Sequence, residues 1–449
     1  MAKYQKYAEY KDSGVEWVDD IPSTWEVKPV FALFTPEMEK NLDGIETNVL
    51  SLSYGRIIQR DVENNHGLLP ESFNTYQIVN DGDIILRLTD LQNDKRSLRV
   101  GLATQKGIIT SAYLKLSALK EIDPKFAYRL LHSYDTTKVF YGMGGGLRQS
   151  MKFEDFRRLP ILVPPKSEQT QIANFLDYET AQIDSLIAKQ EKLIELLKEK
   201  RQAVISHAVT KGLNPDVAMK DSGVEWLGKV PEHWEVTRFA YQIFYQEGPG
   251  ILAVDFHETG IPLLRIQNVK SDFVSNDYKT YLLPSKVLSK WDHYRVEKGD
   301  LIISCSASTG LVSEVDESTV GAIPYTGLIR LKPRTRKIIS QYIKLLVQSD
   351  LFFEQIEVLQ TGSTIQHFGP FHLQQMYISL PPNEEQEVIC LEVKNRVRDI
   401  ENLILKAESA IQLMQERRTA LISAAVTGKI DVRNWQAPTV TEADTELSA

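Results

Sequence analysis

Cysteine is nearly absent from this sequence: Cys305 and Cys390 are the only two among 449 residues, and they lie far apart. Neither has a second cysteine or a histidine at the spacing of a metal-binding motif, so a thiol-rich zinc site is excluded. No run of about 18 apolar residues occurs, and the first residues lack the apolar core of a secretory signal. We therefore expect no membrane span and a cytoplasmic location.

Positive charge is also scarce. The chain has 52 Lys and Arg against 60 Asp and Glu, which gives a formal net charge of −8. A protein that binds nucleic acid alone usually has a strongly basic surface, so any DNA contact must use local basic faces or depend on a partner for phosphate affinity. Hydrophobic residues make up 42% of the sequence, and the length indicates two or three domains with real cores.

Catalytic motifs are missing as well. An adenine methyltransferase would need Asn or Asp before Pro-Pro and Tyr after it, but residues 163–166 read VPPK and residues 380–383 read LPPN. We interpret both Pro-Pro pairs as helix starts. The glycine-rich segment 141–146 lacks the Lys and Ser or Thr of a phosphate-binding loop. It is a flexible turn or, alternatively, a backbone-amide contact with a DNA phosphate. Residues 392–394, EVK, have no partner aspartate at usable distance for a Mg²⁺ site. We expect neither catalytic residues nor metal ligands.

An internal repeat runs through the chain. Residues 11–27 read KDSGVEWVDDIPSTWEV and residues 220–236 read KDSGVEWLGKVPEHWEV, identical at 11 of 17 positions. Further along, the correspondence continues at an offset near 217: GDII at 82–85 matches GDLI at 299–302, and AVISHAVTKGL at 203–213 matches ALISAAVTGKI at 420–430. Self-similarity of this kind predicts one structural unit that occurs twice.

Two long helices are predicted, each starting after a Pro-Pro pair. Apolar positions in both recur at alternating steps of four and three, and this 3.5-residue period is typical of a coiled-coil seam. At about 1.5 Å per residue, some 40 residues extend roughly 60 Å. The seam positions are Ile183, Ile187, Ile194, Leu197 and Val204 in the first helix, and Ile400, Ile404, Ile411, Met414 and Leu421 in the second.

The repeat also predicts how the helices run. If the two units are related by a pseudo-two-fold axis, the helices pair as an antiparallel coiled coil. The N-terminal KDSGVEW would then dock beside the end of the second helix near Gly428, as its twin follows the first helix. Alternatively, each helix packs only on its own domain.

The remaining segments alternate strand-like runs with short helices, so the fold class is α+β. Strands are expected in 48–59, 82–88, 109–117, 261–269, 299–304 and 326–331, and helices in 123–135 and 340–350. Tryptophans 17, 25, 226 and 234 recur with the repeat and are expected to be core or docking anchors. The predicted organisation is a repeat segment at 1–21, a globular domain at 22–165, a helix at 166–214, a repeat segment at 215–230, a globular domain at 231–382, a helix at 383–431 and an acidic flexible tail at 432–449.

These residues together resemble the specificity subunit of type I restriction-modification systems. The resemblance depends on the repeated KDSGVEW segment, VLSLSYGRI at 49–57, IPLLRIQNV at 261–269, the two GD turns, and PP…EQ at 164–169 and 381–386. It covers nearly the whole chain apart from the acidic tail.

The resemblance implies a non-catalytic subunit with two target recognition domains. Each domain reads one half of a bipartite, asymmetric site in double-stranded DNA, and the helices set the unspecified spacer. Two modification subunits would carry AdoMet and methylate adenine N6. Two restriction subunits, where present, would supply an ATP- and Mg-dependent nuclease.

Candidate DNA-contacting residues are the guanidinium and amide groups near strand ends or after the glycine-rich turn, because such groups read guanine and adenine edges. An ordinary solvated or capping role is the alternative for each. The candidates are Arg56, Arg87, Asn93, Arg96, Arg99, Arg148, Gln149 and Ser150 in the first domain, and Arg265, Gln267, Asn268, Gln366 and His367 in the second.

Two other functions stay open. The chain is, in one alternative, a degenerate specificity subunit that serves as a protein-assembly adaptor or a decoy, which the acidic charge favours. A self-contained methyltransferase-nuclease is the other alternative, and it lacks the motifs that it requires.

Overall fold

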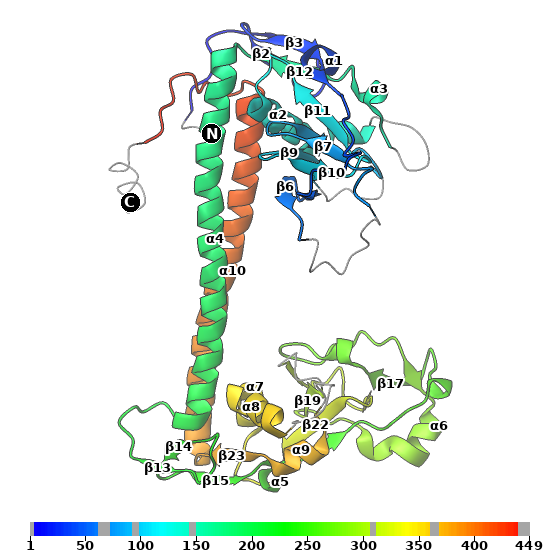
Figure 1. Ribbon diagram of the computed structural model, residues 1–449. Helices are drawn as coiled ribbons and strands as arrows, with labels where there is room; N and C mark the ends of the chain where they lie inside the picture. Colours follow the sequence, from blue (N-terminus) through cyan, green and yellow to red (C-terminus); the bar gives the residue numbers. More distant parts are fainter. Residues whose placement is uncertain are drawn as a thin grey trace. The chain divides into compact units, whose positions relative to one another are not determined.

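The chain forms two units in the computed structural model, which describes residues 4–61, 72–91, 98–142, 150–305, 311–359 and 368–438. The first unit comprises residues 1–190 and 409–449, and the second comprises residues 191–408. Helices α4 (Lys166–Lys211) and α10 (Asn383–Val426) each begin in one unit and end in the other (Figure 1). The first unit is therefore built from two separate stretches of the chain, and the second unit from one continuous stretch.

A four-stranded antiparallel sheet in the order β4-β11-β8-β9 is the centre of the first domain. Its strands are Phe34–Thr35, Leu114–Ala118, Ile84–Leu86 and Val100–Leu102. Helix α2 (Pro124–Thr136) starts where the Asp123 side chain accepts hydrogen bonds from two backbone amides. Its apolar face, with Phe126 and Leu130, joins the main hydrophobic core. The predicted helix over 123–135 is confirmed.

Shorter elements complete this unit. The predicted strand 48–59 is instead a hairpin of β5 (Leu50–Ser53) and β6 (Arg56–Gln59), because Tyr54 and Gly55 both adopt positive φ and reverse the chain. The other elements are β1 (Tyr10–Asp12), β2 (Asp20–Pro22), β3 (Glu26–Pro29), α1 (Val30–Leu33), β7 (Gln77–Val79), β10 (Gly107–Ile109), η1 (Val139–Gly142), α3 (Phe153–Phe156) and β12 (Pro160–Val163).

The second domain repeats this plan. Its four-stranded sheet has the order β16-β22-β19-β20, with strands Ile243–Glu247, Leu328–Pro333, Leu301–Ser304 and Val312–Glu314. Helix α7 (Ser340–Gln348) takes the place of α2. The other elements are β13 (Met219–Asp221), β14 (Lys229–Pro231), β15 (Glu235–Arg238), α5 (Phe239–Gln242), η2 (Ala253–Asp255), α6 (Pro284–Lys286), η4 (Val287–Trp291), η5 (Asp292–Tyr294), α8 (Asp350–Leu359), α9 (Pro370–Gln375) and β23 (Tyr377–Leu380).

One three-stranded sheet of the second domain has only a partial counterpart in the first domain, where Val49 and Ile108 form a single parallel bridge. Strands β18 (Tyr281–Leu282), β17 (Ile261–Leu264) and β21 (Ile323–Pro324) lie in that order, and β17 pairs with β21 in parallel. The predicted strand over 261–269 therefore ends early, and its second half is the 3₁₀ turn η3 (Ile266–Asn268). The parallel pairing is therefore longer in the second domain than in the first, where it is one bridge between Val49 and Ile108.

Each domain is closed by one antiparallel strand pair. Strands β3 and β12 pair from Glu26 opposite Val163, and β15 and β23 pair from Glu235 opposite Leu380. The chain consequently enters and leaves each domain at adjacent points. These closures lie within four residues of the predicted domain limits, 22–165 and 231–382.

The seam positions of the long helices are the less exposed residues of each turn. In α4, Ile183 and Leu197 are buried and Ile187, Ile194 and Val204 are half-buried, while most other positions between them are exposed. Helix α10 shows the same period, with Ile400 and Leu421 buried and Ile404, Ile411 and Met414 half-buried. The burial of both helices follows the 3.5-residue period of the sequence.

One ion pair joins the two long helices in each unit. In the first unit Arg418 Nε lies 3.0 Å from a carboxylate oxygen of Asp184, and in the second Arg201 Nη1 lies 3.5 Å from Glu401. Seventeen residues separate Asp184 from Arg201, and seventeen separate Glu401 from Arg418. Because the internal repeat relates Asp184 to Glu401 and Arg201 to Arg418, the two ion pairs are one contact that occurs twice.

The N-terminal segment docks on the end of α10, as the repeat predicts. The Tyr10 hydroxyl donates to the Gly428 carbonyl at 3.0 Å, and Val15 and Ile430 lie in one hydrophobic cluster. Gly428 has φ +71°, and a Cβ there would meet Pro22 at 2.3 Å, so a glycine is required. Trp435 packs edge-on against Phe175. The predicted flexible tail at 432–449 is therefore wrong for residues up to Trp435, and residues 439–449 lie outside the described ones.

His132 of α2 is a buried histidine beside the helix pair. Burial lowers its pKa to about 4, with contributions from nearby Arg418 and Arg129. Its Nδ1 has no hydrogen-bond partner among the described residues. The folded first unit therefore holds this side chain neutral, whereas an unfolded chain would protonate it near pH 6.5.

We expect this histidine to make the first unit acid-sensitive. Between about pH 6.5 and pH 4 the unfolded chain binds a proton at His132 and the folded chain does not, so the free energy of unfolding falls by about 2–3 kcal/mol as the pH falls. His132→Gln should lose much of this pH dependence, whereas His207→Gln, at an exposed position of α4, should keep it. Urea unfolding at pH 7, 6, 5 and 4 measures the difference. If the free energy of unfolding changed with pH equally in the wild type and in His132→Gln, the interpretation would be contradicted.

Candidate nucleic-acid interface

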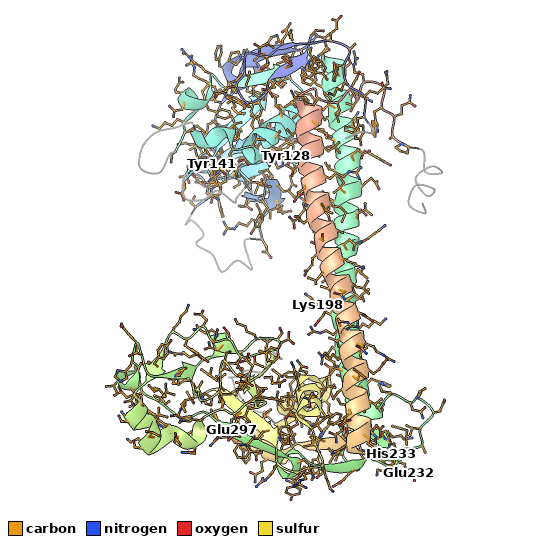
Figure 2. All side chains as sticks on the ribbon, turned by 180° about the vertical axis from the view of Figure 1, so that it is seen from behind. Tyr128, Tyr141, Lys198, Glu232, His233 and Glu297 are labelled. Atoms are coloured by element: carbon orange, nitrogen blue, oxygen red, sulfur yellow. The ribbon has the colours of Figure 1, made fainter. Side chains whose placement is uncertain are left out.

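A glutamate in the first turn of each long helix fastens the repeat segment to it. In the first unit Glu168 accepts hydrogen bonds from the Trp25 indole at 3.0 Å and from the Tyr7 hydroxyl. In the second unit Glu385 accepts from the Trp234 indole at 3.1 Å and contacts His233 at 2.7 Å (Figure 2). Both tryptophans are fully buried. The prediction that these two recurring tryptophans are core or docking anchors is confirmed.

The glutamine that follows holds each domain to its helix. The Gln169 amide donates to the Pro164 carbonyl at 2.8 Å and accepts from the Asp123 amide at 2.6 Å. Gln386 donates to Pro381 at 2.9 Å and accepts from Ile339 at 3.1 Å. The PP…EQ pattern is therefore a joint between helix, repeat segment and domain.

Glu168→Ala should destabilise the first unit. Its carboxylate is 5% exposed, so its removal leaves two buried donors without an acceptor and costs about 2–4 kcal/mol. Glu385→Ala is the matched control, because its side chain is 31% exposed and water can replace it. We expect that variant to lose about 1 kcal/mol. Chemical unfolding followed by tryptophan fluorescence measures both, and equal losses would contradict the difference in burial.

The two GD turns have a structural role. Asp83 accepts from the Asn80 amide at 2.8 Å and lies 3.9 Å from the buried Lys115 ammonium. In the second domain Asp300 accepts from the Glu297 amide at 2.8 Å and lies 3.5 Å from buried Arg330. Burial raises the pKa of Asp300, and Arg330 acts in the opposite direction. The pairing of these aspartates with Lys115 and Arg330 was not predicted from the sequence. A charged residue within an otherwise apolar strand is the pattern that could have indicated it.

Several predicted DNA-contacting residues lie outside the described residues, and nothing is said of their structure. They are Asn93, Arg96, Arg148, Gln149, Gln366 and His367.

Two other candidates have structural partners instead. Arg99 is fully buried, and its guanidinium donates to the backbone carbonyls of Arg87, Thr89 and Asp90 and to the Tyr141 hydroxyl, labelled in Figure 2. Asn268 is 1% exposed, and its side chain bonds three backbone groups of its own loop. Neither prediction of base reading fits these positions, because a buried group with satisfied partners cannot reach a groove.

Three first-domain candidates lie nearer the surface. Arg56 is 71% exposed, at the start of β6, and its guanidinium lies 3.6 Å from Asp184 of α4. Arg87 is half-buried directly after β8, and Ser150 is exposed. Arg56 also lines a hollow with Lys125, Tyr128 and Arg129. Asp177 also lines this hollow and pairs with Lys125 at 3.1 Å and with Arg129 at 2.9 Å, so carboxylates offset much of the positive charge there.

Arg265 and Gln267 of the second domain lie close together after strand β17. Gln267 is exposed, and Arg265 is half-buried, with its guanidinium near two aromatic rings, Phe256 and Tyr325, that contact each other edge to face. The sequence analysis did not find these rings, because they are 9 and 60 residues away along the chain.

The described part of the chain contains no group of three or more His, Cys, Asp or Glu side chains that could hold a metal ion. Among the described helices, none is long and apolar enough to cross a membrane. Burial raises the pKa of each cysteine thiol, Cys305 and Cys390, to about 12, which disfavours thiolate chemistry.

Comparison with protein families gives one match. The model described as "Type I restriction modification DNA specificity domain" matches residues 51–196 and 260–407, well over half of the chain. The two matched segments lie one in each copy of the repeat.

Curated proteins of the same kind are similar over most of their length. The chain is 26% identical to the "Type I restriction enzyme MjaVIII specificity subunit" of Methanocaldococcus jannaschii, over 80% of this chain and 81% of that protein. It is 23% identical to the "Putative type I restriction enzyme MjaX specificity subunit" of the same organism, over 93% and 96%. It is also 23% identical to the EcoKI specificity subunit of Escherichia coli K12, over 64% and 61%.

Solved structures share the fold. A chain from a structure concerned with complex assembly and conformational transition of the type I R-M system has a TM-score of 0.68 at 15% identity, over 90% of this chain and 98% of that one. The HsdS subunit from Thermoanaerobacter tengcongensis has a TM-score of 0.54 at 15% identity, over 91% and 98%. With the family match over both repeats, these findings show that the chain belongs to the type I restriction-modification DNA specificity family and is one of its specificity subunits.

Proposed function

We propose that this chain is the non-catalytic subunit that gives a type I restriction-modification complex its DNA sequence specificity. In this proposal each domain reads one half of a bipartite, asymmetric site, and partner subunits methylate adenine N6 and restrict unmodified DNA. The observation that carries the proposal is that the two domains share the same structural core and the same joint to a long helix but differ in other strands. The joints at Glu168 and Glu385 and the GD turns recur, whereas the three-stranded sheet around β17 corresponds to two separate strand pairs in the first domain.

The long helices are proposed to pair along their length as an antiparallel coiled coil that sets the spacer between half-sites. Two observations support this. The same ion pair occurs in both units, and both helices bury positions at a 3.5-residue period. An antiparallel pair suits a ruler, because it directs the two domains toward opposite ends.

Two modification subunits are proposed to bind the helices at equivalent places. Leu186 and Leu196 of α4 are 37% and 49% exposed, and their repeat counterparts Leu403 and Leu413 of α10 are 48% and 62% exposed. An exposed apolar side chain that recurs in the repeat suits two copies of one partner. AdoMet would be bound by the modification subunits, and ATP and Mg by two restriction subunits where these are present.

The net charge of −8 fits a subunit that binds DNA together with such partners, because they would supply the phosphate contacts. The same charge favours the second candidate, a degenerate specificity subunit that acts as an assembly adaptor or a decoy. The two candidate functions differ in whether the assembled complex binds and methylates a specific DNA sequence.

The test is to express the chain with its modification partner and map N6-methyladenine across the host genome. We expect one bipartite motif with a fixed spacer. A complex that forms but methylates without sequence preference would overturn the proposal. A complex that forms without any specific DNA binding would support the adaptor or decoy.

A further inference from the structure

Parallel pairing of β17 with β21 brings Arg265 beside Tyr325. Leu264 lies opposite Pro324 in the sheet, and the Tyr325 amide donates to the Leu264 carbonyl at 2.9 Å. Since the carboxyl ends of parallel strands lie at the same edge, the next residue of each strand, Arg265 and Tyr325, emerges there together. Phe256 joins them from the loop before β17.

The Arg265 guanidinium is held by two aromatic rings. Its Cζ lies 5.3 Å from the Phe256 ring centre and 4.9 Å from that of Tyr325. Among the described residues no other cation contacts two rings. A cation–π contact holds a guanidinium near a ring without using its N–H donors in a conventional hydrogen bond, so these contacts leave the donors of Arg265 available.

The donors of Arg265 have no partner among the described residues. Other arginines of the chain that are held as firmly do have one: Arg99 donates to three carbonyls, and Arg330 lies 3.5 Å from Asp300. Arg265 is half-buried, and its guanidinium forms no ion pair or hydrogen bond with the described residues. A fixed guanidinium with unused donors is suited to bind a pair of acceptors on another molecule.

The turn that carries Arg265 is also fixed. The Asn268 side chain accepts from the Arg265 amide at 2.9 Å and donates to the carbonyls of Ser275 and Asp277, each at 3.0 Å. This closes η3 and leaves Gln267, two residues after Arg265, exposed. A guanidinium and an amide are therefore presented by one short rigid turn.

We propose that this turn is a DNA contact of the second domain, in which Arg265 donates two hydrogen bonds to an acceptor pair on DNA. The pair is either the O6 and N7 edge of a guanine or two oxygens of a phosphate, both of which fit a planar guanidinium. Gln267 lies next to the same stretch of DNA. The inference rests on the proposed function and adds which residues of the second domain carry it.

The test uses the complete complex with its modification partner. Arg265→Ala, Arg265→Lys and Gln267→Ala are compared with Arg336→Ala, which removes one exposed positive charge elsewhere in the same unit. Binding to a duplex that carries the mapped motif is measured at several salt concentrations, and the methylated motif of each variant is mapped. Arg265→Ala should weaken binding about 10- to 100-fold, while Arg336→Ala changes it less than about threefold.

The two acceptor pairs give different results. If Arg265 contacts guanine, Arg265→Ala and Arg265→Lys relax one position of one half-site and leave the other half-site intact. If it contacts phosphate, all sequences lose affinity alike, the slope of log affinity against log salt falls by about one, and Arg265→Lys restores part of the binding. Binding and motif like those of Arg336→Ala would overturn the inference. Lack of any specific motif with the wild-type chain would instead overturn the proposed function.

Discussion

Replacing residues 26–163 with the corresponding domain of another specificity subunit should change one half of the methylated site and leave the other half unaltered. The expected effect is large, because specific binding exceeds non-specific binding by about 10³-fold or more. The cut points follow from the structure. Glu26 and Val163 are paired across β3 and β12, so the exchanged domain begins and ends at neighbouring positions.

The joint to the helix is preserved in this exchange. Trp25 and Glu168 both lie outside the replaced segment, and so does Gln169. The reciprocal exchange of residues 235–380 leaves Trp234 and Glu385 in place in the same way and should change only the other half-site. Genome-wide mapping of N6-methyladenine shows which half-site changes in each exchange. A change in both half-sites after one exchange would show that the domains do not read DNA independently.

Inserting four residues into each long helix at facing positions should lengthen the spacer by about two base pairs and leave both half-sites unaltered. In the proposed antiparallel pairing, the facing positions are those after Lys192 and after Ser409, which the repeat relates and which lie between the two ion pairs along each helix. Four residues add about 6 Å and turn the helix by about 40° in the right-handed sense. Two base pairs of B-DNA add about 7 Å and turn in the same sense by about 70°.

A seven-residue insertion at the same places is the informative control. It preserves the 3.5-residue seam and adds about 10 Å, close to three base pairs, but it turns the helix by only about 20° in the opposite sense. The DNA would turn by about 100° over that length. We therefore expect weaker methylation of any site from the seven-residue variant, although its fold is the less disturbed of the two. An unchanged spacer in the four-residue variant would contradict the role of the helices as a ruler.

Much of the architecture was predictable from sequence because it depends on local periodicity and on repetition. The seam of Ile183, Leu197 and Ile400 follows from apolar spacing alone, and side chains 3.5 residues apart share one face of a helix wherever it lies. The duplicated KDSGVEW segment predicted its own docking site. The second copy follows the end of the first long helix in the sequence, and the first copy makes the equivalent contact with the end of the second helix as a tertiary contact. Helix starts after Pro-Pro followed from backbone geometry.

The candidate site was predictable only in part. Arg99 and Arg265 look alike in the sequence, since each is an arginine near a strand end. Their roles differ because carbonyls of residues 87–90 surround the first, whereas two rings, one of them 60 residues away, surround the second. A sequence pattern indicates which face of a helix or strand a residue lies on. It does not indicate which residues of a distant strand contact that residue.

The sequence by itself therefore determined the repeat, the two long helices, the α+β class and the family, all of which rest on order and spacing along the chain. Only the tertiary structure decided which polar groups have hydrogen-bond partners inside the protein. Glu168 meets Trp25 across 143 residues, and Asn268 is consumed by its own loop. Burial and partners decide whether a donor is available to DNA, and both depend on contacts between segments that sequence spacing does not encode.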